Sequence, residues 1–219
     1  MKNQKTTHPQ TRINANSLRK IIACTIGIVA IIITTNSSLA GTTEDNLLMH
    51  HAAKLSKAGK NEEALKIFLE ITKRDPKNFY AHNNLAMVYS QTKKYNKALK
   101  SYEKSLSLNP TFSMSLNNIG NLHMTMGHYD KAEEYLKKSL TYFKTFHLAS
   151  MNLGELYFKK KKYDDAMKYL KKALIDMPTL SRAHKLIGEI HYLQGRKEEA
   201  RKEFSIYKKM IEKSKQFYN

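Results

Sequence analysis

The strongest constraint in this sequence is a pattern that returns every 34 residues. The stretches YNKALKSYEKSL, YDKAEEYLKKSL and YDDAMKYLKKAL begin at Tyr95, Tyr129 and Tyr163. Extended in both directions, the pattern gives five copies without an insertion, at residues 45–78, 79–112, 113–146, 147–180 and 181–214. A fixed period of this length is typical of chains whose repeats stack on their neighbours and share one continuous core.

Each copy predicts two helices separated by a turn. Small residues recur in register where two helices must approach closely, at Ala52, Ala86, Gly120, Gly154 and Gly188 in the first half and at Ala64, Ala98, Ala132, Ala166 and Ala200 in the second. Large apolar residues recur beside them and fill the space between helices. The turns KAGKN, QTKKY, TMGHY, KKKKY and LQGRK follow the first helix, and three of them contain the glycine that a tight turn favours.

The end of the second helix differs among the copies. Pro76, Pro110 and Pro178 close it in three of them, because proline cannot continue a helix. Lys144 takes this place in the third copy, so we expect the helix that ends near Phe143 to run on. The fifth copy has no proline either, and a terminal helix from about Lys197 to Gln216 is expected to cover the end of the array, with residues 215–219 as the C-terminal tail of this capping helix.

The second copy, NNLAMVYSQTKKYNKALKSYEKSLSLNP, carries nearly the whole pattern of one family. A leucine and a small residue in the first helix, followed by alanine, an aromatic residue and proline in the second, resemble the tetratricopeptide repeat. The resemblance covers residues 45–214. It implies an all-α fold, a right-handed α-solenoid (superhelix) of antiparallel helix pairs whose first helices line the concave side, and a role in binding other proteins.

The first forty residues have the composition of an export signal. Five basic residues precede a 13-residue apolar run at 21–33, and Ser38 and Ala40 are small residues before Gly41. We expect cleavage before Gly41, because the run is shorter than the roughly 20 residues that span a membrane. An uncleaved membrane anchor at residues 21–39 is the alternative. Both hypotheses place the repeats in the periplasm or cell envelope, outside the cytoplasm.

The remaining chain offers little for catalysis. The one cysteine, Cys24, lies in the export segment, so thiol chemistry and disulfides are excluded from residues 41–219. Most histidines there fall at packing positions of the repeat, with His123 and His191 in the place of Tyr89 and Tyr157. No phosphate-binding loop, dinucleotide motif or zinc motif is present. We therefore expect neither an enzyme nor a bound cofactor or metal.

One face of the first helices is the candidate binding surface. On a helical wheel of residues 79–91, one side holds Leu85, Ala86 and Tyr89, whereas the opposite side holds Tyr80, Asn84, Met87 and Gln91. With their equivalents one repeat apart, the predicted peptide-binding residues are Tyr80, Asn84, Met87, Gln91, Met114, Asn118, Asn121, Asn152, Glu155 and Arg182. Asn84, Asn118 and Asn152 form a column of carboxamides that could bond the main chain of an extended peptide. The alternative is that they bond only within the array.

Some tetratricopeptide repeat proteins grip a C-terminal carboxylate with lysine, asparagine and arginine from three consecutive repeats. Asn121, Asn152 and Arg182 match three of those places. Asn117 replaces a lysine and Leu186 an arginine, so the match is incomplete.

The charge of the chain suggests a second surface. Basic residues number 38 and acidic ones 19, and 33 of the basic residues lie outside the export segment. Lysines concentrate in the second helices and turns, at Lys97, Lys100, Lys104, Lys137, Lys138, Lys168, Lys171, Lys172 and 159–162. Such a convex basic face is usually solvated, but it could also attach to anionic lipid or another acidic envelope polymer.

The sequence thus favours a non-enzymatic scaffold or adaptor of a bacterial envelope assembly that binds a protein or peptide partner in its concave groove. The alternative is a protein that associates with the envelope surface or an anionic membrane through its basic face. Nucleic acid is the least favoured partner, because no binding module for it is recognisable.

Overall fold

The structure is a computed structural model that describes residues 44–216. The predicted export segment at 1–40 and the last three residues lie outside this range. The chain divides into two compact units, Met1–His50 and His51–Asn219. Of the first unit only residues 44–50 are described, and they are helical.

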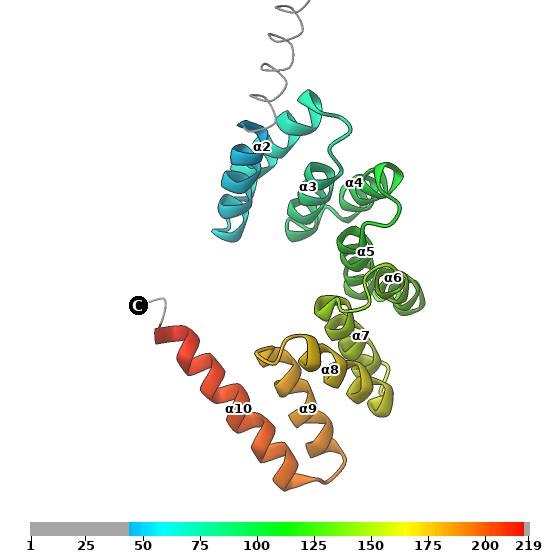
Figure 1. Ribbon diagram of the computed structural model, residues 1–219, viewed down its shortest axis with the longest axis vertical. Coiled ribbons are helices and arrows are strands. Elements are labelled where there is room, and N and C mark those ends of the chain that lie inside the picture. The colour runs from blue at the N-terminus through cyan, green and yellow to red at the C-terminus, as the bar shows by residue number, and fades with distance from the viewer. Residues whose placement is uncertain (1–43, 217–219) are drawn as a thin grey trace, which may run out of the picture. The chain divides into compact units, whose positions relative to one another are not determined.

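The second unit is an all-α solenoid of consecutive helix pairs (Figure 1). Residues 51–57 are helical and lead through a turn into α2. The helices that follow are α2 (Asn61–Arg74), α3 (Phe79–Gln91), α4 (Tyr95–Leu108), α5 (Ser113–Thr125), α6 (Tyr129–Tyr142), α7 (His147–Lys159), α8 (Tyr163–Asp176), α9 (Ser181–Leu193) and α10 (Lys197–Gln216). From α3 on, the first helix of each pair begins 34 residues after the previous one, as the repeat requires.

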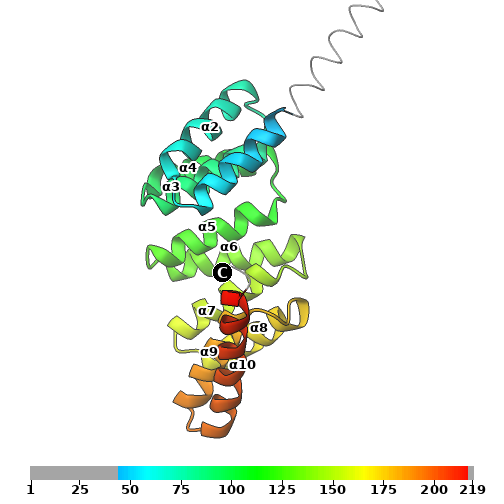
Figure 2. The same cartoon turned by 90° about the vertical axis from the view of Figure 1, so that its left-hand side faces the viewer.

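Each first helix packs antiparallel on the second helix of its own pair and then on its neighbours. The closest pairs are α3 with α4, α5 with α6, α7 with α8, and α9 with α10. The first helices α3, α5, α7 and α9 also contact one another in succession. In Figure 1, α3 and α5 lie on the inner side of the curve and α4 and α6 on the outer side, and Figure 2 shows the same stack from the side.

Small residues let the paired helices come together. A Cβ on Gly154 of α7 would lie 2.6 Å from Cγ of Leu170 on α8, and Gly120 has the same relation to Leu136. Both leucines are fully buried. Alanines complete the contact from the second helices, since Ala98, Ala132 and Ala166 are completely buried in the described array.

The turns between paired helices share one backbone conformation whatever their sequence. Gly59, Gly127 and Gly195 have φ values of 78–79°, in the left-handed region. Lys93 and Lys161 adopt the same region, with φ values of 59° and 58°. In this region the Cβ of a lysine crowds the neighbouring backbone, whereas glycine has no Cβ. The packing on both sides therefore fixes the turn, and glycine is not required for it.

The expectation that the helix near Phe143 runs on is wrong. Helix α6 ends at Tyr142 and has 14 residues, as α4 and α8 do. The backbone of Phe143 turns to φ −137° and ψ 91°, and its N–H donates to the carbonyl of Ser139. Phe146 is buried and contacts the ring of Phe143, so apolar packing ends this helix in place of proline.

The last helix is longer than its predecessors. Helix α10 has 20 residues and packs on α9, with Ala200 buried. Its ring of Phe204 lies over Gly188. Within residues 44–216, no helix combines the length and the apolar character that crossing a membrane would need.

Candidate functional site

The predicted binding residues lie on the first helices, on the side away from their paired second helices. We call this side the groove face. Of its predicted members, Tyr80, Met87, Gln91, Met114, Asn121 and Arg182 are exposed, Asn84, Asn118 and Asn152 are half-buried, and Glu155 is buried. The face therefore offers both open contact surface and partly enclosed polar groups.

The carboxamides form a hydrogen-bonded chain across three repeats, which we call the asparagine ladder. Nδ2 of Asn152 donates to Oδ1 of Asn117 at 2.9 Å, and Nδ2 of Asn117 donates to Oδ1 of Asn118 at 3.3 Å. Nδ2 of Asn118 then donates to Oδ1 of Asn83 at 3.1 Å, and Nδ2 of Asn83 donates to Oδ1 of Asn84 at 3.3 Å. Both bonds that join neighbouring repeats are donated toward the N-terminal repeat, so the ladder has a direction.

Two residues outside the predicted binding set hold the ladder together: Asn83, which the sequence analysis did not name, and Asn117, which it considered only as the replacement of a clamp lysine. Their side chains are only 1% and 4% exposed. Asn83 also accepts a bond of 3.0 Å from Oγ of Ser115, and its Nδ2 contacts Sδ of Met87 at 3.7 Å. A buried amide needs such partners, because an unsatisfied polar group in the core is costly. The signal in the sequence was the Asn-Asn pair, which recurs 34 residues later.

The ladder does not use up the bonding capacity of the outer carboxamides. A primary amide has two N–H donors and two acceptor sites on its oxygen. Asn118 donates one bond and accepts one within the ladder, which leaves one of each. Asn84 accepts its ladder bond and lines a hollow of about 80 Å³ together with Lys57, Phe68 and Met87. Both predicted roles of these residues, bonding within the array and facing a ligand, are therefore compatible.

An apolar row runs beside the ladder. Tyr80, Met114 and Leu148 take the same place in three successive repeats and are 51%, 40% and 41% exposed. The ring of Tyr80 is supported by Phe79 and Phe112, with ring centroids 4.2 Å and 5.0 Å away. Exposed apolar side chains that line up in this way are typical of an interaction surface.

The fifth repeat departs from the row and from the ladder. Arg182 replaces the apolar residue, and its guanidinium lies 2.5 Å from Oε2 of Glu155. Leu186 replaces the asparagine and is buried. Glu155 and Arg182, both predicted to face a ligand, are thus brought together as an ion pair that closes the C-terminal end of the groove face.

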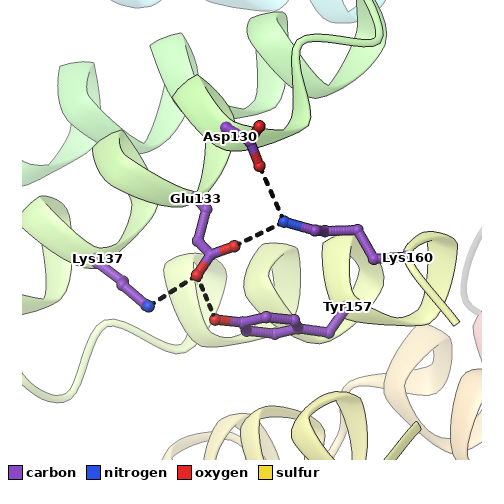
Figure 3. Close-up of polar contacts among 5 residues, drawn as sticks. All are labelled: Asp130, Glu133, Lys137, Tyr157 and Lys160. Atoms are coloured by element: carbon purple, nitrogen blue, oxygen red, sulfur yellow. Dashed lines mark hydrogen bonds and ion pairs between the residues drawn. The ribbon is translucent and has the colours of Figure 1, made fainter. Parts of the chain in front are cut away.

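A second polar cluster lies away from the groove face, between α6 and α7 (Figure 3). Oε1 of Glu133 accepts bonds of 2.7 Å from Nζ of Lys137 and from the hydroxyl of Tyr157. Nζ of Lys160 donates at 3.0 Å to Oε2 of Glu133 and to Oδ1 of Asp130. Burial raises the pKa of Glu133, but the bonds from Lys137, Tyr157 and Lys160 outweigh it and lower this pKa to about 2.

We expect this cluster to stabilise the junction of the third and fourth repeats in a pH-dependent way. A carboxylate whose pKa falls from 4.5 to about 2 on folding contributes stability above pH 4.5, and that stability is lost as the pH falls toward 2. Glu133→Gln should therefore cost about 1–2 kcal/mol at pH 7, a value kept low by solvent screening of half-exposed Lys137. The difference in unfolding free energy between the variant and the parent should disappear near pH 2. Urea unfolding across this range measures it.

Glu134→Gln is the matched control, because Glu134 is exposed on the same helix. Its effect on the urea midpoint should stay small over the whole pH range. If both variants depend on pH alike, the cluster around Glu133 does not stabilise the junction.

The cluster also reduces the basic surface. Lys137 and Lys160 were both counted among the lysines of the predicted convex face, and both are engaged by carboxylates. Lys171 and Lys138 remain exposed on their helices. The basic face is thus interrupted at the junction between α6 and α7.

His123 lies at a packing position, whereas His50, His51 and His128 are exposed. The ring of His123 stacks on Tyr135 at 5.6 Å, as that of Tyr157 stacks on Tyr169 at 5.5 Å. Burial, aided by the charge of Lys131, lowers the pKa of His123. Between residues 44 and 216, no three histidine, aspartate or glutamate side chains gather as a metal site would require.

Several solved structures share this fold. PilW, a type IV pilus biogenesis factor, is 27% identical with a TM-score of 0.68, and the match covers 77% of this chain and 78% of PilW. PilF of Pseudomonas aeruginosa is 20% identical with a TM-score of 0.70, covering 76% of each chain. MamA is 22% identical with a TM-score of 0.61, covering 75% of this chain and 96% of MamA.

The comparison with curated proteins gives no match. Family models give several, and all of them describe the tetratricopeptide repeat. One matches residues 79–112, a second matches 101–134, and a third matches 123–190 and 157–209. Together they span more than half of the sequence, over the helices that carry the ladder. The chain belongs to the tetratricopeptide repeat family.

Proposed function

We propose that this protein is an exported, non-enzymatic scaffold of a bacterial envelope assembly that binds an extended segment of a partner protein on its groove face. The observation that carries the proposal is the asparagine ladder beside the exposed row of Tyr80, Met114 and Leu148. Carboxamides with spare donors and acceptors can bond a peptide main chain, and the apolar row can bury its side chains.

The envelope location rests on the predicted export signal and on the likeness to PilW, a type IV pilus biogenesis factor. The family itself supports a protein partner. The rival function, attachment to an anionic surface through the convex lysines, is weakened because Lys137 and Lys160 are held by Glu133 and Asp130. A groove partner also needs no net charge attraction to be specific.

Site-specific photocrosslinking in the native host tests the proposal. A photoreactive amino acid replaces Asn121, which is exposed on the groove face, in the full-length chain. The matched control carries it at Lys138, which is exposed on α6. We expect one distinct protein adduct from position 121 and none of the same mass from position 138.

Salt distinguishes the two surfaces. The adduct at position 121 should persist at about 0.5 M salt, whereas attachment through many lysines would be lost because charges are screened within a few ångströms. Adducts that form only at position 138 and disappear with salt would show that the convex face is the binding surface.

A further inference from the structure

The spacing of the apolar row constrains the conformation of a partner. Helices α3, α5 and α7 contact one another in succession, and packed helices lie about 8–10 Å apart. Tyr80, Met114 and Leu148 hold the same place on these helices. Their anchoring points therefore repeat about every 8–10 Å along the groove face.

Regular conformations match this repeat to different degrees. A β-strand returns a side chain to the same face about every 6.6 Å, which is too short. A polyproline II segment has three residues per turn and rises about 3.1 Å per residue, so every third side chain returns after about 9.3 Å. An α-helix returns a side chain to nearly the same face after seven residues, or about 10.5 Å, and must be excluded on other grounds.

Hydrogen bonding distinguishes the polyproline II segment from the α-helix. In an α-helix the main-chain N–H and C=O groups bond one another, so they do not need hydrogen bonds from the ladder. A polyproline II segment has no internal hydrogen bonds, so its N–H and C=O groups need external partners. Asn118 keeps one donor and one acceptor for them, and Asn84 keeps both of its N–H groups.

The N-terminal end of the groove face adds two further preferences. The rings of Tyr80 and Phe112 pack edge to face, with centroids 5.0 Å apart and planes at 76°, and together form an aromatic surface. Grooves lined by aromatic rings are used to dock proline-rich segments. The exposed Lys57 lines the hollow beside Asn84 and Met87, so negative charge on the partner is complementary there.

We propose that the groove face takes a proline-rich, acidic segment in the polyproline II conformation, with an apolar side chain at every third position lying on Tyr80, Met114 and Leu148. This inference rests on the proposed function and names the partner segment that the same face selects. The three apolar contacts set the period, and the ladder bonds the main chain between them.

Two labelled peptides of identical composition test the proposal. One repeats Leu-Pro-Glu three times, and the other places the same three leucines at alternate positions. We expect the full-length chain to bind the first at least tenfold more tightly by fluorescence anisotropy at physiological salt. A third peptide with lysine in place of glutamate should bind at least threefold more weakly than the first.

A variant links the effect to the groove face. Leu148→Ser should weaken the binding of the period-three peptide at least fivefold, and Lys138→Ala on α6 should leave it unchanged. Circular dichroism establishes that both variants keep their helix content. Equal affinity for the two leucine arrangements, or no measurable binding of either, overturns the inference. The proposed function survives that result if position 121 still crosslinks a partner, and fails if only position 138 does.

Discussion

Replacing Gly154 with leucine is expected to destabilise the folded array by about 3 kcal/mol, the upper range for overpacking a core. Even the first atom of the new side chain would lie 2.6 Å and 2.7 Å from Cγ and Cδ2 of Leu170, and 3.2 Å from its backbone N. Because Leu170 is fully buried, it has no free space to move into. Helices α7 and α8 must separate, and this disturbs the junctions on both sides.

Urea unfolding of the full-length chain followed by circular dichroism measures this loss. Lys171→Ala is the matched control, because Lys171 neighbours Leu170 on α8 but is exposed. It should change the free energy of unfolding by less than about 0.5 kcal/mol. Comparable effects of the two substitutions would mean that the α7–α8 contact tolerates a large side chain at position 154.

Much of the fold follows from the period alone. Once Gly120 and Gly154 are in register, each must face the second helix of its pair, and the structure places Leu136 and Leu170 there. At the turns and helix ends, the identity of the residue predicts the backbone conformation less well. Lys161 adopts a backbone that glycine prefers, and Phe143 ends a helix without proline, because in both places the surrounding packing decides the conformation.

The sequence predicted which way the side chains of the candidate site point, but not which residues they contact. A helical wheel places Asn84 and Asn118 outward, yet it gives no distance to a neighbouring repeat. It also assigns Asn83 no partner, although this side chain bonds Asn118 thirty-five residues away. Glu133 was missed for a related reason. Leu99 and Met167 hold its place in the adjacent repeats, and only the structure shows the Tyr157 hydroxyl that it meets.

The asparagine ladder gives the second large expected effect. Asn117→Ala should lower the free energy of unfolding by about 1–3 kcal/mol, because it removes two hydrogen bonds that each contribute about 0.5–1.5 kcal/mol. The lost bonds are the one accepted from Asn152 and the one donated to Asn118. Asn121→Ala is the matched control, since Asn121 is exposed on the same helix and should change stability by less than about 0.5 kcal/mol.

A double-mutant cycle decides whether residues bonded to each other in the ladder are energetically coupled. Asn117→Ala and Asn152→Ala each break the same bond of 2.9 Å, so combining them should cost less than the sum of the single losses, by at least about 0.5 kcal/mol. Asn84→Ala combined with Asn152→Ala should instead be nearly additive, because these residues occupy opposite ends. Additive losses for Asn117 and Asn152, measured by urea unfolding, would show that the carboxamides stabilise the array independently and are not coupled through the ladder.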